Sequence, residues 1–97
     1  MSNMKSFNVA YDETSDVLYI STRKEPATRG IEDRHGIVWR YAADGELIGA
    51  TIIDFQDIWS ERQTDLAREL SSHFDVPQQK AEIVLEHALE DLGRKSE

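Results

Sequence analysis

The chain has 97 residues and no cysteine, and its 19 acidic and 11 basic side chains give a formal charge of -8. This length fits one domain, and the absence of cysteine excludes disulfides, thiolate metal sites and a cysteine nucleophile. The basic residues occur in pairs and not in stripes, which argues against nucleic-acid binding, and no apolar run approaches the roughly 18 residues of a membrane span. We therefore expect a cytoplasmic protein whose direct partners include neither nucleic acid nor a membrane.

Residues 7–22 have the pattern of a β-hairpin. Apolar side chains alternate with polar ones before a polar loop, and a nearly continuous apolar strand follows it. The loop residues are Asp12, Glu13, Thr14 and Ser15. A four-residue loop would place Val9 opposite Leu18, whereas a three-residue loop with a bulge would place Val9 opposite Tyr19. The pattern leaves these two registers open.

Residues 23–35 read as a connection between two hairpins. Pro26 cannot donate a hydrogen bond to a strand partner and Gly30 weakens a strand, so any strand here is short and lies at an edge. Ile31 is the only large apolar residue in the segment. Such an edge is a place where another chain could add a strand, although the surrounding charges also protect it from doing so.

Residues 36–55 contain a second hairpin, in which Asp44-Gly45 separates two β-rich runs. An Asp-Gly pair predicts a two-residue type I′ turn, because Gly supplies the positive φ that this turn needs and Asp tolerates it. The turn would place Tyr41 opposite Ile48, Trp39 opposite Ala50 and Ile37 opposite Ile52, which makes one face of the hairpin apolar. The second face is only half apolar, and its members are Val38, Arg40, Ala42, Leu47, Gly49, Thr51 and Ile53.

The apolar period changes from 2 to 3.6 after Phe55. It predicts a helix that begins at about residue 58 or 61 and ends near residue 73. Asp75 and Pro77 are typical of the start of a second helix, and Gly93 would be its C-cap. Ile83 lies opposite the apolar stripe of this last helix, where it indicates a second contact surface.

We therefore predict an α+β fold: a four-stranded, mostly antiparallel sheet built from two β-hairpins, followed by two C-terminal helices, at least one of which covers the sheet. Residues 1–97 form a single domain in this prediction. The sheet occupies residues 6–55, and residues 56–97 are a helical extension.

Three segments of the first half resemble, at fixed spacing, a small bacterial family known as domain of unknown function 2283. They are Tyr11-Asp12-Glu13-Thr14-Ser15-Asp16-Val17-Leu18-Tyr19-Ile20, Gly36-Ile37-Val38 and Asp44-Gly45-Glu46-Leu47-Ile48-Gly49-Ala50-Thr51-Ile52-Ile53-Asp54. The resemblance covers about residues 6–55, and it departs from the family at Ser15, where alanine is frequent. It implies a β-rich domain without an established activity or catalytic residues, and some members are suspected of pairing with small toxin-like proteins.

Two clusters of polar residues are candidates for chemistry. If the second hairpin keeps its register to its open end, His35 lies opposite Asp54, and with Asp33 they could form an acid–base pair. The alternative, which we favour, is a polar pair that closes the sheet rim. No nucleophile or phosphate loop is near in the sequence, so no reaction class can be named. Asp12, Glu13 and Asp16 lack calcium-loop spacing and are better explained by turn capping, so we predict no metal and no cofactor.

The leading hypothesis is a homodimeric, non-enzymatic protein-interaction module, with an antitoxin-like role as its sharper version. Its partner would be a second copy or a small basic protein, because the exterior is acidic. The interface candidates are Val38, Leu47 and Ile53 on the half-apolar sheet face and Ile83 on the last helix. The alternative is a small-ligand binder or enzyme that uses Asp33, His35 and Asp54.

Overall fold

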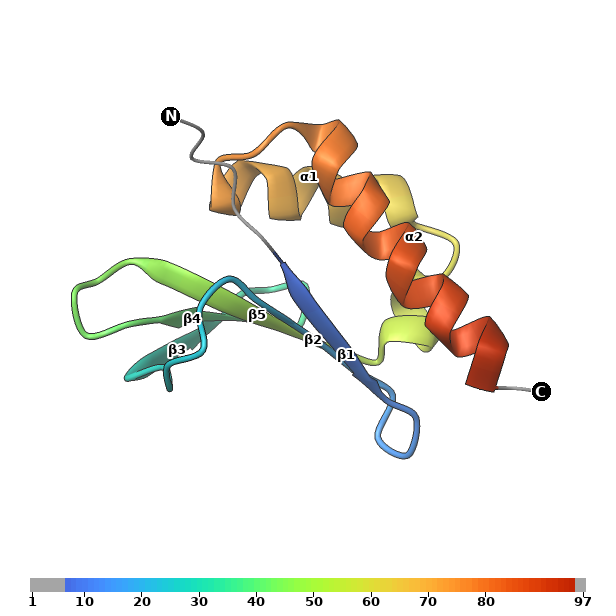
Figure 1. Ribbon diagram of the computed structural model, residues 1–97, viewed down its shortest axis with the longest axis horizontal. Coiled ribbons are helices and arrows are strands. Elements are labelled where there is room, and N and C mark those ends of the chain that lie inside the picture. The colour runs from blue at the N-terminus through green and yellow to red at the C-terminus, as the bar shows by residue number, and fades with distance from the viewer. Residues whose placement is uncertain (1–6, 96–97) are drawn as a thin grey trace.

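A computed structural model describes residues 7–95, apart from the side chains of Leu89 and of residues 91–95. The chain forms an antiparallel sheet followed by helices (Figure 1). Its elements are β1 (Asn8–Asp12), β2 (Val17–Ser21), β3 (Arg29–Glu32), β4 (Ile37–Tyr41), β5 (Leu47–Ile53), the π-helix η1 (Phe55–Trp59), α1 (Gln63–Phe74) and α2 (Gln78–Lys95). Within the residues that the structure describes, no helix is both long enough and apolar enough to cross a bilayer.

The sheet has five strands in the order β1-β2-β5-β4-β3, and every neighbouring pair is antiparallel. The prediction of an α+β fold with an antiparallel sheet and C-terminal helices is confirmed, but the prediction of four strands is wrong. The extra strand is β3, in the segment that we interpreted as a connection. All four of its side chains are exposed, so hydrophobic periodicity could not reveal it.

The first hairpin has a register that neither alternative anticipated. Asp12 still belongs to β1 and faces Val17, and Val9 faces Ile20. The loop therefore begins one residue later than predicted and ends at Asp16, whose left-handed φ of 57° turns the chain into β2. Asp is among the few residues that tolerate this conformation, which is why the turn ends there.

The body of the second hairpin has the predicted register, with Trp39 opposite Ala50 and Ile37 opposite Ile52, but its turn differs. Ala42 N–H donates to Glu46 O and Gly45 N–H donates to Ala42 O, so the loop has three residues instead of two. Gly45 alone takes a positive φ, of 87°, as expected for a type I turn followed by a bulge.

A second irregularity, between Arg40 and Tyr41, compensates for the longer loop. It restores the predicted register further along the strands, but near the turn Tyr41 faces Leu47 and not Ile48. Leu47 consequently packs against the core, whereas Ile48 lines a hollow on the opposite face of the sheet. A bulge shifts side chains in this way because it sets two residues of one strand against one of the other.

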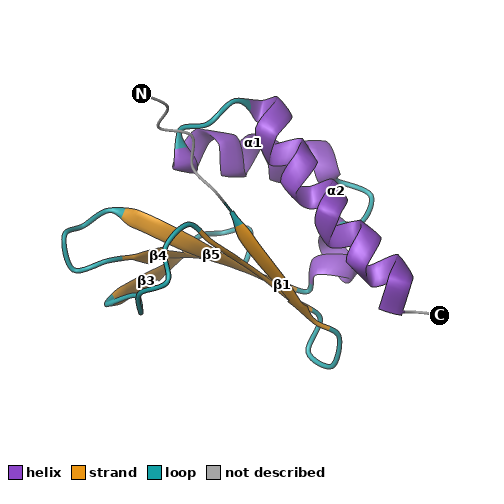
Figure 2. Ribbon diagram, viewed as in Figure 1, coloured by secondary structure: helices purple, strands orange, loops and turns teal. Residues whose placement is uncertain are grey.

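Both helices lie on one side of the sheet (Figure 2). The side chains that meet between the layers are fully buried: the largest are Leu18, Ile37, Ile52, Phe55, Trp59, Leu66, Phe74 and Leu85. The helix expected from residue 58 or 61 to about residue 73 corresponds to α1, which begins later, at Gln63, because residues 55–59 wind separately as a π-helix. α2 continues past Gly93 to Lys95, so the C-cap expected at Gly93 is also wrong.

Trp39 is a core residue whose removal should be costly, since it is 2% exposed, stacks on His73 at 3.8 Å and donates its Nε1–H to Asp33 Oδ2 at 2.9 Å. We expect Trp39→Ala to lower the free energy of unfolding by about 3–5 kcal/mol, because it leaves a large cavity. Urea unfolding followed by circular dichroism measures this. Tyr19→Ala is the control at an exposed strand position, and an equal loss in both variants would contradict the assignment.

Candidate interaction surface

Asp16 joins the first turn to the segment that follows the sheet. Its Oδ1 accepts hydrogen bonds from Tyr11 Oη at 2.6 Å and from Gln56 N–H at 3.0 Å, and its Oδ2 accepts one from Asp57 N–H at 3.3 Å. Its carbonyl oxygen accepts a bond from Phe55 N–H. Burial by itself would raise the pKa of Asp16, but these hydrogen bonds to the carboxylate hold that pKa below its ordinary value. The carboxylate is thus committed to anchoring the start of η1.

The other acidic residues of the family-like motifs have similar local tasks. The carboxylate of Asp12 accepts hydrogen bonds from Thr14 N–H and Ser15 Oγ–H within its own loop. Asp44 Oδ1 accepts one from Glu46 N–H at 3.0 Å. Such side-chain-to-backbone bonds two residues apart are what make Asp a turn residue. No three His, Asp or Glu side chains come together as possible metal ligands within the described part of the chain.

Asp33 closes the β3–β4 loop with three hydrogen bonds. It accepts from His35 N–H at 2.8 Å, from Ile37 N–H at 3.1 Å and from Trp39 Nε1–H at 2.9 Å. Burial would raise the pKa of Asp33, yet the bonds from Trp39, Ile37 and His35 hold it below the ordinary value. Asp33 therefore acts as an acceptor for the loop and for the core tryptophan. Sequence reasoning missed this role, although the spacing of Asp33 and Gly36 is a local signal for such a loop.

The predicted pair of His35 and Asp54 is not joined in the structure. Strand pairing ends at Ile37 opposite Ile52, because Gly36 turns the chain with a φ of 83° and Asp54 is left-handed at a φ of 57°. The His35 ring packs edge-on against Trp59, with the ring centroids 6.2 Å apart. Asp54 is exposed at the start of η1, where its side chain makes no capping bond. The structure thus brings Asp33 close to His35 through a backbone contact, and it leaves Asp54 apart.

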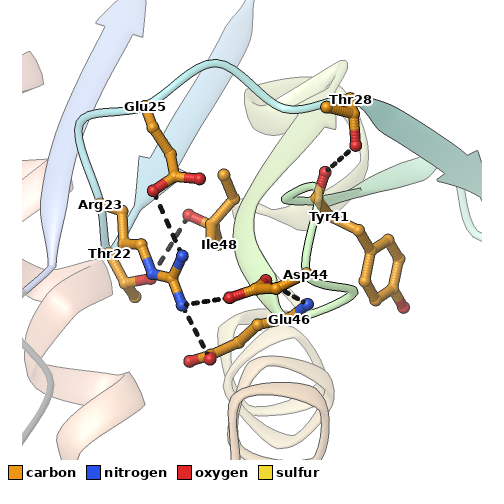
Figure 3. Close-up of polar contacts among 8 residues, drawn as sticks. All are labelled: Thr22, Arg23, Glu25, Thr28, Tyr41, Asp44, Glu46 and Ile48. Carbon is orange, nitrogen blue, oxygen red and sulfur yellow. Dashed lines mark hydrogen bonds and ion pairs between the residues drawn. The ribbon is translucent and has the colours of Figure 1, made fainter.

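The connection between β2 and β3 passes over the tip of the β4–β5 hairpin and is tied to it by Arg23 (Figure 3). The guanidinium contacts Glu25 at 3.2 Å, Asp44 at 3.4 Å and Glu46 at 2.7 Å. Backbone bonds from Thr22 N–H to Ile48 O and from Thr28 N–H to Tyr41 O hold the two ends of the connection. The hydroxyl groups of Thr22 and Thr28 donate to the same two carbonyl oxygens (Figure 3). Surface ion pairs contribute little individually, so the backbone bonds and the network together hold this segment.

The face of the sheet opposite the helices is not covered by them (Figure 2), and we call it the outer face. Alternation along the strands places on it Val17, Tyr19, Val38, Arg40, Thr51 and Ile53. Tyr19 is 43% exposed and Ile53 is 37% exposed. Beside them, the β2–β3 connection covers a hollow of about 130 Å³ lined by Tyr19, Arg23, Ala27, Arg40, Ile48 and Thr51, among others.

The four predicted interface residues do not form one surface. Val38 and Ile53 lie on the outer face, as the half-apolar pattern suggested. Leu47 does not, because the bulge turns it towards the core. Ile83 is 49% exposed on α2, which lies on the helical side of the sheet (Figure 1).

Arg40 has an unusual position on the outer face. Its Nε–H donates to Thr51 Oγ1 at 2.7 Å, and its Nη1 lies 3.8 Å from the place where a Cβ on Gly30 would be. No carboxylate lies within ion-pair distance of this guanidinium, among residues 7–95. Arg40 is therefore a fixed positive charge that lies across the backbone of an edge strand.

Comparison with known proteins gives one family. A family model described as "Protein of unknown function (DUF2283)" matches residues 8–56. This segment contains all five strands and ends within η1, so α1 and α2 lie outside it. No curated protein and no solved structure matches the chain.

Asp16→Asn tests the anchoring bonds. The pKa of Asp16 is lower in the folded chain than in the unfolded chain, where it is near 3.8. The carboxylate therefore stabilises the fold fully at pH values above 3.8, and this stabilisation is lost as the pH falls through the pKa of the folded state. We expect the variant to lose about 1–3 kcal/mol at neutral pH and to show a smaller further loss in acid. Urea unfolding at a series of pH values measures both. Glu13→Gln, in the same loop, is the control, and parallel pH curves for Asp16→Asn and wild type would disprove the role.

Tyr11 should make the stability of the fold depend on pH in the alkaline range. Burial, followed by the hydrogen bond and charge of Asp16, raises the pKa of Tyr11 from 10.0 to about 12. A raised pKa means that the stabilisation is complete below pH 10.0 and is lost as the pH rises from there towards 12. We expect Tyr11→Phe to remove this part of the alkaline destabilisation. Thermal unfolding between neutral and alkaline pH measures the effect, and an unchanged alkaline slope in the variant would contradict it.

Proposed function

This chain belongs to the DUF2283 family through residues 8–56, and from that premise we propose that it is a non-enzymatic, homodimeric protein-interaction module whose docking surface is the outer face of the sheet. The observation that carries the proposal is that the helices cover one face of the sheet and leave the other open. Tyr19, Val38 and Ile53 lie on this face and remain in contact with solvent unless a partner covers them. Apolar residues beside a fixed arginine are typical of the centre of a protein interface.

The acidic residues support the same interpretation. The carboxylates of Asp16 and Asp33 accept hydrogen bonds from the backbone and the core. A general base needs a carboxylate that can reach a substrate, so these two residues are poor candidates for that role. The alternative, an enzyme or ligand binder that uses Asp33, His35 and Asp54, gains no support from this arrangement, because His35 and Asp54 are not joined.

The finer proposal concerns the partner, which we infer to be a small basic protein in an antitoxin-like pairing. Two observations support it. The formal charge is -8, and the acidic side chain of Asp12, on the edge strand β1, borders the outer face. Opposite charge across an interface speeds association and selects the partner.

Replacing apolar residues on the outer face tests the proposal. We expect Tyr19→Lys combined with Ile53→Lys to weaken binding of the partner by at least about tenfold while leaving the fold intact, because both side chains are exposed and the new charges repel a basic partner. The partner is first identified by affinity capture with the wild-type chain from its own cells, then purified and titrated by calorimetry.

Ile83→Lys is the control on the helical side of the molecule: at a similar exposure it introduces one charge of the same sign, where the outer-face variant introduces two. Equal weakening by the control and the outer-face variant would show a general charge effect. Unchanged affinity in the outer-face variant would overturn the assignment of the docking surface.

A further inference from the structure

β3 is the last strand on one side of the sheet and has only β4 as a neighbour. Its four residues are all exposed, and Ile31 is 47% exposed. The strand contains no proline and no bulge, two of the devices that stop an edge from pairing with another chain, although it is short and carries the charged residues Arg29 and Glu32, which also restrict pairing. Its free side therefore presents the backbone donors and acceptors of those residues that do not bond to β4.

The identity of those backbone groups follows from the hydrogen-bond pattern. Antiparallel strands alternate between pairs that exchange hydrogen bonds and pairs that do not. Asp33 N–H donates to Ile37 O at the loop end of the β3–β4 pair, so the alternation makes Ile31 opposite Trp39 the next bonded pair. Gly30 and Glu32 belong to the pairs between, and their N–H and C=O groups point away from β4.

We propose that β3 of a second copy binds this edge in antiparallel orientation, with a two-fold axis at Ile31. Side chains that lie directly opposite each other must be on the same face of a sheet, and this register satisfies that condition. Gly30 of each copy then faces Glu32 of the other, and both residues direct their free backbone groups across the junction. The two five-stranded sheets become one continuous sheet.

The side chains on the outer face are complementary in this register. Glu32 of the second copy stands opposite Gly30, which has no side chain of its own; Val38 Cγ1 and Arg40 Nη1 lie 3.2 and 3.8 Å from the place where a Cβ on Gly30 would be. Arg40 has no carboxylate partner within the described chain, and the register supplies one from the other copy. The two-fold axis repeats this Arg40–Glu32 ion pair, so each junction contains two.

The side chains on the helical face are complementary as well. Ile31 meets Ile31 of the second copy in a non-bonded pair, the type in which opposing side chains approach most closely. Its exposed surface is thereby covered. This inference rests on the homodimer of the proposed function, and it specifies the contact: an edge-to-edge junction that leaves both outer faces open and side by side for a partner.

Charge reversal tests the junction. In a Glu32→Arg chain both ion pairs become contacts between like positive charges, and in an Arg40→Glu chain they become contacts between like negative charges. We expect each variant to self-associate at least about tenfold more weakly than wild type. A 1:1 mixture of the two variants restores both ion pairs, one as in the wild type and one with the charges exchanged, and we expect it to form heterodimers with near wild-type affinity. Sedimentation velocity over a concentration series, with native mass spectrometry of the mixture, measures both effects.

Glu86→Arg on the exposed side of α2 is the control for the change in charge, and it should dimerise like wild type. A wild-type chain that stays monomeric, or a mixture that forms no heterodimers, would overturn the junction. Neither result affects the outer-face assignment, because titration of the partner reports that surface separately. Conversely, if the outer-face variant binds the partner normally but the charge-reversed chains still form heterodimers, the docking surface is wrong and the junction is supported.

Discussion

The junction between the sheet and the helical segment depends on the hydrogen bonds of one carboxylate. Asp16 ends the turn of the first hairpin, and its side chain accepts a backbone bond from Gln56, which is 40 residues further along the chain. The bond fixes where the chain leaves β5 and how η1 begins, and η1 directs the following helices to one side of the sheet. Tyr11 adds the third contact from β1, so this group joins the first strand, the second strand and the start of the helical segment.

The residues that carry the family resemblance therefore build the fold. Asp12 and Asp44 stabilise loops, Gly45 supplies a left-handed turn, and Asp16 anchors the helices. Groups committed in this way have little capacity left for chemistry on a substrate. The surfaces on which we base the proposed function, the outer face and the free edge of β3, are formed by side chains between these anchoring positions.

A one-sided arrangement of layers explains both surfaces. Antiparallel sheets commonly pack one face on a core and expose the other, and the exposed face is then expected to be polar. Here it keeps Tyr19, Val38 and Ile53, and the crossing connection tied by Arg23 covers only the hollow above Ile48. Arg40 extends the outer face to the edge strand, because its side chain lies across Gly30. The docking surface and the proposed junction therefore adjoin each other.

The sequence by itself determined the features that depend on local pattern. Period-two apolar runs around Asp44-Gly45 fixed the second hairpin and the pairing of Trp39 with Ala50, and the later period of 3.6 predicted two helices. Only the tertiary structure decided which contacts form between distant segments. β3 has no buried side chain to reveal it, a bulge moved Leu47 from the predicted interface into the core, and His35 and Asp54 separated because two left-handed residues end the strand pairing. These outcomes depend on backbone geometry and long-range hydrogen bonds, which hydrophobic periodicity does not encode.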